Sequence, residues 1–366
     1  MPARKNSIPS IDSPEKLELT DLFSRTISYL RLSLTDRCNL QCLYCVPKED
    51  GSDSPECSPC SPSLAHDDLL SYEELLRVVR VAVSLGISKL RLTGGEPLVR
   101  KDVMLFIDQL AKIDNLNDIR ITTNGVLLEK FAEPLVAAGL TKINISLDTL
   151  QPKRFAHITG VDCFDRVWRG IELAQAVGFT SIKLNTVVMR GINDDELEDF
   201  VRMSQETAMQ IRFIEFMPIG SSSRWDKKVY ISSDEIMERI NRLSDRLGDS
   251  FGELIPVSRD RADGPATMFR AGQGAKGKVG FISPISHQFC EHCNRLRLTS
   301  EGMLRSCLLD DQETDLRSIL RQGGSEQDIC QALVTAVRNK PKGHQIKERL
   351  RNQGENCHGR MSRIGG

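Results

Sequence analysis

Short runs of β-branched and aliphatic residues recur through the first two thirds of the chain. Runs of this composition and length are typical of strands in a parallel sheet whose two faces are both covered. The pattern therefore predicts six buried strands, at residues 29–34, 89–93, 118–122, 142–147, 181–188 and 211–216.

Segments with a helical spacing of apolar residues lie between these strands. In residues 71–85, Leu75, Leu76 and Val79 fall on one face of the expected helix. Ser71 stands where a helix N-cap is expected. Similar spacing predicts further helices over residues 101–113, 127–138, 164–178 and 194–206. Strands that alternate with helices in this way indicate an α/β fold built from βα repeats around a parallel sheet.

Six repeats, where a complete barrel has eight, predict an incomplete (β/α)6 TIM-like barrel. An open, doubly wound sheet is an alternative that the pattern alone leaves open. Both folds place the ligand at the carboxyl ends of the strands, so we expect functional residues at strand ends and in the loops that follow.

Two regions interrupt the repeat pattern. Residues 48–66 are rich in Ser, Pro and Asp and are interpreted as an exposed polar insertion, and the helical spacing weakens after about residue 245. We therefore expect a smaller C-terminal α+β unit after the barrel. The predicted division is a flexible segment at 1–22, a barrel at 23–245, a C-terminal unit at 246–340 and a basic tail at 341–366.

Charge and composition narrow the classes of protein. Lys plus Arg is 49 and Asp plus Glu is 50, so the net charge is −1, and the chain has no excess positive charge with which to bind a nucleic-acid backbone. No apolar run approaches the roughly 18 residues that a membrane-spanning helix needs. The N-terminal stretch has no apolar core and contains acidic residues, so we expect neither an export signal nor a transit peptide. We therefore expect a cytoplasmic protein with no membrane or nucleic-acid partner.

Eleven cysteines in such a chain favour metal or cluster ligation over disulfides. Cys38, Cys42 and Cys45 form a C-x3-C-x2-C motif directly after the first predicted strand. Three thiolates without a fourth local ligand suit a [4Fe–4S] cluster that leaves one iron open to an exogenous ligand. Structural zinc is nearly always held by four Cys or His ligands, and this loop contains no histidine.

This motif, with Tyr44 before its last cysteine, resembles that of the radical S-adenosylmethionine (SAM) superfamily. The resemblance implies a partial (β/α)6 barrel, in agreement with the predicted strands. It also implies that SAM chelates the open iron and is cleaved reductively to a 5′-deoxyadenosyl radical. The turn Gly94-Gly95-Glu96-Pro97 follows the second strand, and the resemblance makes it the site that holds the SAM amino group.

A second group of cysteines lies in the C-terminal unit. Cys290, Cys293 and Cys307 form a C-x2-C-x13-C motif. Spacing alone leaves two interpretations evenly matched, an iron–sulfur cluster and a zinc ion with His287 or His292 as the fourth ligand.

Together with the segment Asn294-Arg295-Leu296-Arg297, this motif after a radical SAM barrel resembles the GTP 3′,8-cyclase family. The resemblance extends over about residues 23–366. It implies that the three cysteines hold an auxiliary [4Fe–4S] cluster whose open iron contacts the guanine of GTP.

The resemblance also implies roles for individual residues. SAM is expected to contact Tyr44, Gly95, Ser146 and Met217. GTP is expected to contact Arg31, Arg91, Thr122, Lys183, Arg295, Leu296 and Arg297. Guanidinium groups bind phosphate oxygens bidentately, so cations on barrel strands would find a partner in a triphosphate. The last residues, Gly365 and Gly366, match the family's terminal double glycine, which is expected to reach into the active site.

The implied activity is the first step of molybdenum cofactor synthesis. The deoxyadenosyl radical abstracts hydrogen from C3′ of the GTP ribose, the C3′ radical adds to C8 of guanine, and reduction gives (8S)-3′,8-cyclo-7,8-dihydroguanosine 5′-triphosphate. No side chain is expected to be catalytic beyond the cluster and SAM.

The same resemblance implies the partners. They are an electron donor and the next enzyme of the pathway, cyclic pyranopterin monophosphate synthase, and the chain is expected to be a monomer or homodimer. Two alternatives remain: another radical SAM enzyme with an auxiliary cluster that acts on a peptide or RNA, and, from a different class, a non-enzymatic zinc-binding module.

Four other features are interpreted as structural. Residues 272–279 nearly match the phosphate-binding loop, but Val279 lacks the required hydroxyl and a strand follows, so a hairpin connection is predicted. Asn124 and Gly125 are interpreted as a turn without chemistry, and Asp148 as a helix N-cap. The pair Cys57 and Cys60, in the polar insertion, is interpreted as exposed and inert.

Overall fold

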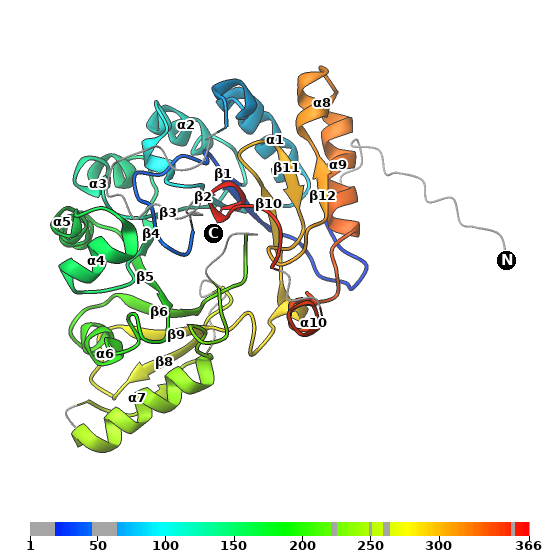
Figure 1. Ribbon diagram of the computed structural model, residues 1–366. Helices are drawn as coiled ribbons and strands as arrows, with labels where there is room; N and C mark the ends of the chain where they lie inside the picture. Colours follow the sequence, from blue (N-terminus) through cyan, green and yellow to red (C-terminus); the bar gives the residue numbers. More distant parts are fainter. Residues whose placement is uncertain are drawn as a thin grey trace.

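The structure is a computed structural model that describes residues 19–45, 64–220, 225–248, 251–258, 264–352 and 356–365. Within these residues one sheet of twelve strands runs through the molecule, and helices cover its outer face (Figure 1). The barrel strands are β1 (Tyr29–Ser33), β2 (Lys89–Thr93), β3 (Asp118–Thr123), β4 (Lys142–Ser146), β5 (Ser181–Val188) and β6 (Gln210–Glu215).

Strands β1 to β6 are parallel and stand side by side in chain order. A doubly wound sheet would reverse its strand order at a switch point. The predicted incomplete barrel is therefore confirmed, and each predicted strand lies within one residue of the observed bounds.

The C-terminal part of the chain extends the same sheet at both of its edges. Its strands are β7 (Leu254–Pro256), β8 (Thr267–Ala271), β9 (Lys278–Ile282), β10 (Arg295–Leu298), β11 (Met303–Arg305) and β12 (Glu313–Asp315). Strand β10 pairs in parallel with β1, and β9 pairs in parallel with β6. The C-terminal α+β unit is thus continuous with the barrel sheet, and its second cysteine group comes next to β1.

The segment that resembles a phosphate-binding loop joins two antiparallel strands. Residues 272–277 connect β8 to β9, which pair from Thr267 with Phe281 onward. The predicted hairpin connection is confirmed, and no helix follows the glycines in this described stretch, as a phosphate-binding loop would require.

The barrel helices lie where the apolar spacing predicts them. They are α1 (Tyr72–Ser84), α2 (Val103–Leu110), α3 (Leu128–Ala137), α4 (Pro152–Thr159), α5 (Phe164–Ala176), α6 (Leu197–Glu206) and α7 (Ser233–Leu247). Ser71 caps α1, because its side chain accepts a hydrogen bond from the Glu74 amide and Glu74 returns one. Helices α4 and α7 lie outside the predicted set.

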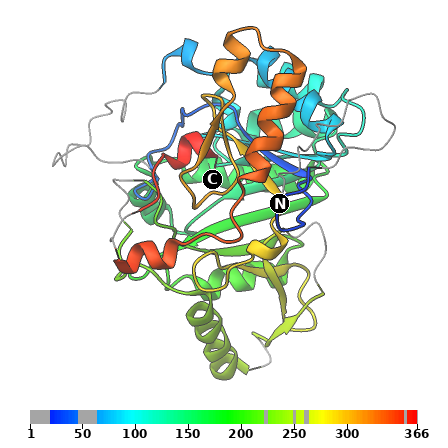
Figure 2. The same cartoon turned by 90° about the vertical axis from the view of Figure 1, so that its right-hand side faces the viewer.

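The C-terminal helices gather on the side of the barrel that carries β1 and β10. They are α8 (Arg317–Arg321), α9 (Glu326–Arg338), α10 (Ile346–Asn352) and α11 (Met361–Ile364). Figure 2 shows α9, in orange, upright beside the barrel, with α10 and α11, in red, to its left. Across the described ranges, no helix is long and apolar enough to cross a membrane.

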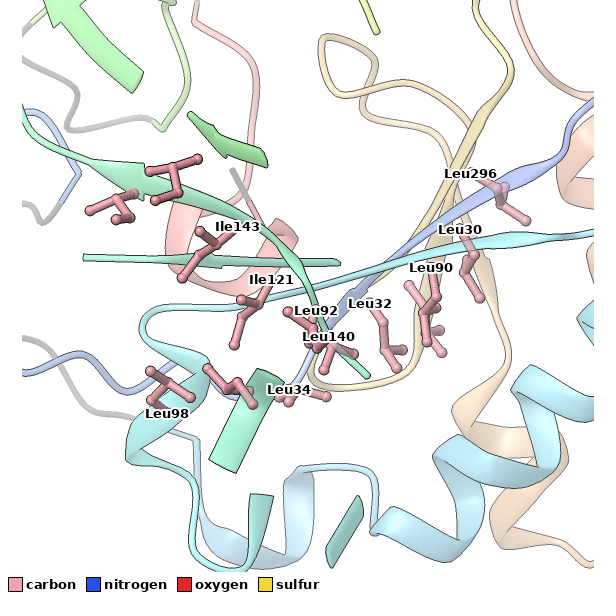
Figure 3. Close-up of a cluster of buried hydrophobic side chains, with 14 of the residues drawn as sticks. Leu30, Leu32, Leu34, Leu90, Leu92, Leu98, Ile121, Leu140, Ile143 and Leu296 are labelled. Atoms are coloured by element: carbon pink, nitrogen blue, oxygen red, sulfur yellow. The ribbon is translucent and has the colours of Figure 1, made fainter. Parts of the chain in front are cut away.

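The barrel strands alternate between apolar and polar side chains. Leu30, Leu32, Leu90 and Leu92 point toward the surrounding helices and are fully buried there (Figure 3). The residues between them point to the other face of the sheet, since successive side chains of a strand face opposite sides. The strands therefore have one apolar face and one polar face, which differs from the expected strands that are apolar on both. The polar face lines the inside of the barrel.

Candidate functional site

The first cysteine group, Cys38, Cys42 and Cys45, lies in the loop after β1. The Leu40 amide points at the Cys38 sulfur at 3.4 Å, and the Cys45 amide donates to the Cys42 carbonyl at 2.9 Å. The loop is held on α4 by the amides of Gln41 and Leu43, which donate to the carbonyls of Thr159 and Ile158. Burial raises the pKa of the Cys45 thiol to about 12. A metal that binds here would have to displace the thiol proton, because the thiolate is the ligand form of cysteine.

The Gly94-Gly95 turn after β2 packs directly on the first cysteine loop. The Gly95 amide donates to the Thr35 carbonyl at 2.8 Å, and the Glu96 amide donates to the Arg37 carbonyl at 2.9 Å. A Cβ atom at Gly95 would overlap the Arg37 carbonyl. Glycine is therefore required at this position, because the two backbone segments are in direct contact. This contact positions the cysteine loop relative to the end of β2.

Glu96 joins this turn to the end of β3. Its carboxylate accepts hydrogen bonds from the amide of Leu98 at 3.0 Å, the hydroxyl of Thr123 at 2.9 Å and the amide of Asn124 at 2.7 Å. The Asn124 side chain in turn donates to the Cys38 sulfur at 3.6 Å. Gly125 has the positive φ of 83° that the predicted turn requires, and Asn124 in addition places its side-chain amide against a thiol of the first cysteine group. Burial raises the pKa of Glu96 to about 7.

Tyr44 and Asp148 form a second connection between the cysteine loop and the barrel. The Tyr44 hydroxyl donates to Asp148 at 2.6 Å, and the Val187 amide donates to the other carboxylate oxygen at 2.8 Å. Burial raises the pKa of Asp148 to about 6. The prediction that Asp148 is a helix N-cap is wrong, because α4 begins after Gln151. The carboxylate instead holds Tyr44 in place.

The other residues expected to contact SAM stand around the same end of the barrel. Ser146 is the last residue of β4, and Met217 follows β6 and lines the central cavity. With Gly95 after β2, the residues come from alternate strands and share the carboxyl end of the sheet, where both candidate folds place a ligand.

The second cysteine group, Cys290, Cys293 and Cys307, lines this cavity. Burial raises the pKa of the Cys293 thiol, but the charges of Arg295 and Lys340 lower it more and leave it at about 6. Lys340 is fixed by the backbone carbonyls of Arg295 and Ser306, to which its ammonium donates. This positive surrounding favours the thiolate that a cluster needs.

The zinc interpretation of the second group is not supported by the positions of its histidines. His287 lies 2.7 Å from a carboxylate oxygen of Asp234, and both His287 and His292 are exposed. Among the described residues, no three His, Cys, Asp or Glu side chains converge as they would around a single ion. The thiolates of a four-iron cluster bind different irons, so this spacing fits a cluster better than zinc.

Four arginines form a row across adjacent strands, which we call the cation row. The strand register places Arg297 beside Arg31, Arg31 beside Arg91, and Arg91 beside Arg120. All four line the cavity, and Arg91, Arg120 and Arg297 are buried. Registered residues of a parallel sheet face the same side. The row is therefore a dense positive surface inside the barrel, suited to an anion with several charges.

The expected GTP residues Thr122, Lys183 and Arg295 stand near this row. The Arg91 guanidinium donates to the Thr122 hydroxyl at 3.2 Å. Lys183 is buried and registered with Asn144, which lines the cavity, and Arg295 lines it directly. Leu296 points the other way, into the apolar layer that contains Leu30 (Figure 3). Its side chain therefore does not enter the cavity.

The structure adds cavity residues that the sequence analysis does not name. They are Tyr29, Lys89, Asn144, Asn185, Arg212 and His344, together with Arg120 of the cation row. Counting every second strand residue from Arg31 and Arg91 would have found Tyr29 and Lys89, and counting in the same way from Thr122, Ser146 and Lys183 would have found Arg120, Asn144 and Asn185. Tyr29 accepts a hydrogen bond from Arg91. Burial raises the pKa of Tyr29, but Arg91, Arg31 and Lys89 lower it more, to about 7.

The C-terminal end of the chain reaches this site. The Gly365 carbonyl accepts a hydrogen bond from Arg297 of the cation row. A Cβ atom at Gly365 would overlap the Thr93 hydroxyl at the end of β2. Gly366, and the pair Cys57 and Cys60, lie outside the described residues.

Known proteins share both halves of this arrangement. Residues 32–204 match the Radical SAM superfamily, and residues 209–346 match Molybdenum Cofactor Synthesis C. The GTP 3′,8-cyclase of Thermodesulfovibrio yellowstonii is 47% identical over 325 residues, which cover 89% of this chain and 95% of that protein. The GTP 3′,8-cyclase of Peptoclostridium acidaminophilum is 44% identical over 352 residues, which cover 96% of this chain and 99% of that protein.

A solved structure shares the fold at much lower identity. Streptococcus suis SuiB, bound to S-adenosylmethionine, is similar with a TM-score of 0.55 and 15% identity, over 92% of this chain and 77% of that chain. At this identity the similarity shows the fold alone.

Proposed function

The chain belongs to the GTP 3′,8-cyclase family of radical SAM enzymes, and we propose that it cyclises GTP in the first step of molybdenum cofactor synthesis. Its cofactors are SAM and two [4Fe–4S] clusters. When bound, the first cluster and SAM supply the 5′-deoxyadenosyl radical that abstracts hydrogen from C3′ of GTP.

The residues divide between the two clusters. Cys38, Cys42 and Cys45 would hold the SAM cluster, and Cys290, Cys293 and Cys307 the auxiliary cluster. Around SAM, Tyr44, Gly95, Ser146 and Met217 would form the pocket. We assign the barrel to residues 23–245, the auxiliary-cluster unit to 246–340 and the tail to 341–366.

The position of the cation row carries this proposal. Arg295 is registered with Tyr29 at the start of β1, only two positions after Cys293, and β1 then leads toward Cys38. The row therefore lies between the two cysteine groups. A nucleoside triphosphate can place its phosphates on Arg31, Arg91 and Arg297 while its base faces the auxiliary cluster. Contacts at both ends of the nucleotide would hold its C3′ and C8 atoms in a single orientation.

The experiment is anaerobic 5′-deoxyadenosine formation by the reconstituted, reduced enzyme with SAM. The incubations contain GTP, ATP or no nucleotide, and Cys38→Ala is the control that lacks the SAM cluster. GTP should be consumed in step with 5′-deoxyadenosine formation, while ATP gives the background rate. Cleavage of SAM that is indifferent to GTP would overturn the substrate assignment and favour the alternative enzyme that acts on a peptide or RNA.

We also propose the partners implied by this reaction. An electron donor must reduce the SAM cluster, and cyclic pyranopterin monophosphate synthase would take the product. The chain would act as a monomer or homodimer in the cytoplasm, which size-exclusion chromatography and cell fractionation test.

A further inference from the structure

Tyr29 contacts two of the cations that line the cavity. It is the first residue of β1 and is only 7% exposed. Its hydroxyl accepts a hydrogen bond from Nε of Arg91. The ammonium group of Lys89, the residue registered with Tyr29 on β2, lies 4.8 Å from the centroid of the Tyr29 ring. All three residues line the cavity, so one aromatic side chain contacts both cations that β2 contributes to this site.

The bond to Tyr29 fixes one side of the Arg91 guanidinium, and Thr122 fixes another. Nη1 of Arg91 donates to the Thr122 hydroxyl on β3 at 3.2 Å. A guanidinium group is planar and has five N–H donors in fixed directions. Two bonds to different strands therefore set the plane of the group and the directions of its remaining donors.

Lys89 is held by its contact with the ring and by an ion pair. Its Nζ atom lies 3.7 Å from a carboxylate oxygen of Asp118, the first residue of β3. A lysine side chain is flexible and loses about 2 kcal/mol of rotamer entropy when it is fixed. The face of an aromatic ring attracts an ammonium group. Tyr29 and Asp118 thus restrict this side chain from the two strands that flank β2.

These contacts are needed because the cations of the cavity repel one another. The register places Arg31 beside Arg91, and Arg295 beside Tyr29. Burial raises the pKa of Tyr29, but three cations lower it more, to about 7, namely Arg91, Arg31 and Lys89. An oxygen atom in such a positive field is a strong hydrogen-bond acceptor. The bond from Arg91 to Tyr29 therefore offsets part of the repulsion between Arg91 and Arg31.

We propose that Tyr29 is a positioning residue for substrate binding, which holds Arg91 by its hydroxyl and Lys89 by its ring face in the orientations that bind GTP. The inference rests on the proposed function, because it assumes that GTP occupies the cavity. Tyr29 need not touch GTP for this role. Side chains that are ordered beforehand lose less entropy on binding, so the contacts of Tyr29 should raise the affinity for GTP and leave the radical chemistry unchanged.

Two variants separate the hydroxyl from the ring. Tyr29→Phe removes the acceptor for Arg91 but keeps the ring beside Lys89, and Tyr29→Leu removes both. Tyr72→Phe is the matched control, because the Tyr72 hydroxyl donates to the Lys101 carbonyl at 2.9 Å, and Tyr72, on α1, does not line the cavity. The reconstituted enzymes are compared by anaerobic equilibrium binding of GTP, by kcat and KM for GTP consumption, by iron content and by melting temperature.

Tyr29→Phe should bind GTP about fivefold more weakly, because the charged donor of Arg91 loses its acceptor. KM should rise with the dissociation constant, while kcat stays close to that of the wild type. Tyr29→Leu should bind GTP about twentyfold more weakly, because Lys89 loses the ring as well. Iron content, melting temperature and SAM cleavage without GTP should be unchanged in Tyr29→Phe, and Tyr72→Phe should match the wild type in every measurement.

A double-mutant cycle shows whether Tyr29 acts through Arg91. In Arg91→Met, GTP can still bind Arg31 and Arg297, so its weaker binding can be measured. In that background Tyr29→Phe should have no further effect on the affinity for GTP, because no guanidinium is left for its hydroxyl to hold.

Three results would overturn the inference. One is wild-type affinity and KM for GTP in Tyr29→Phe. Another is an equal loss of affinity from Tyr29→Phe with and without Arg91, which would mean that Tyr29 binds GTP itself. The third is loss of iron or a lower melting temperature in Tyr29→Phe, as a purely structural role would give. Wild-type enzyme that neither binds nor consumes GTP would instead refute the proposed function, so the two failures are distinguishable.

Discussion

Removal of one thiol from each cysteine group should have different effects on SAM cleavage and on GTP consumption. Cys38→Ala should abolish 5′-deoxyadenosine formation, because the SAM cluster loses one of three ligands. Cys290→Ala should retain the SAM cluster but lose GTP consumption, because only the auxiliary cluster is disrupted. Iron content, 5′-deoxyadenosine and residual GTP are measured in parallel.

Cys163→Ala is the control for these two variants, because Cys163 precedes α5 and its side chain makes no capping hydrogen bond. It should leave all three quantities unchanged. Normal cyclisation by Cys290→Ala would contradict the assignment of the auxiliary cluster.

The buried carboxyl of Glu96 should make the stability of the folded protein depend on pH. The pKa of its buried carboxyl in the folded protein, about 7, is above its ordinary value of 4.5. The folded protein therefore holds the Glu96 proton more tightly than the unfolded chain does. The protonated carboxyl stabilises the folded state at low pH, and this contribution is lost as the pH rises through about 7. On going from pH 8 to pH 6, the wild type should therefore gain about 1 kcal/mol of stability relative to Glu96→Gln.

Chemical denaturation of the reduced protein without clusters, at both pH values, measures this difference. Glu96→Gln should also be less stable at every pH by about 1–3 kcal/mol, because one of its three donors loses an acceptor. A pH-independent difference would show that Glu96 does not titrate in this range.

The turn after β2 should be needed to position the first cysteine loop. Gly95→Ala forces a Cβ atom against the Arg37 carbonyl, so the turn and the cysteine loop must move apart. We expect a loss of about 1–3 kcal/mol in unfolding free energy and a reduced iron content after reconstitution. Gly274→Ala is the matched control, because a Cβ atom there meets nothing within 4 Å. Equal effects of the two substitutions would contradict this account of the turn.

Local pattern predicts the elements of this fold better than it predicts how they pair. The strands at 89–93 and 181–188 have the predicted bounds, because a run of aliphatic and β-branched residues is a local feature of the sequence. The pairing of β10 with β1 joins residues far apart in sequence, and nothing in the short run Arg295–Leu298 specifies its neighbour. The sequence therefore predicts a C-terminal unit but not that it extends the barrel sheet.

The same limit applies to the candidate site. The cysteine motifs are local, so spacing reveals them, and the resemblance supplies roles for residues such as Arg31. The side chains of Asn124 and Asp148 contact Cys38 and Tyr44, which lie 86 and 104 positions away in the sequence. Contacts of this range follow from the sheet register and loop packing, which a single sequence does not reveal.

The side chain of Arg25 connects the N-terminal part of the molecule with the auxiliary-cluster unit through hydrogen bonds. It is buried, forms an ion pair with Asp21 and donates to the carbonyls of Cys290, Pro341 and Lys342. Arg25→Ala should cost about 3–5 kcal/mol, because it leaves the buried Asp21 carboxylate without its cation. It should also reduce the iron bound by the second group, while the first group still cleaves SAM.

Thermal unfolding and iron content of the anaerobic protein test this prediction. Arg169→Ala is the control, because Arg169 pairs with Glu129 on the surface and should leave the melting temperature unchanged. Loss of iron from both groups in Arg25→Ala would show that the contact supports the whole barrel.

The C-terminal segment connects the last residues of the chain with the first strands. Gly365 has a positive φ of 77°, its carbonyl accepts a hydrogen bond from Arg297, and a Cβ atom added to it would overlap the Thr93 hydroxyl. Gly365→Ala should displace this segment from the cation row and lower kcat for GTP at least tenfold, with little change in melting temperature. Gly323 has a similar φ of 72° but open space around it, so Gly323→Ala carries the same backbone strain without the steric conflict. If both variants lose activity equally, backbone strain explains the loss; if only Gly365→Ala does, the seating of the chain end against β2 is required for turnover.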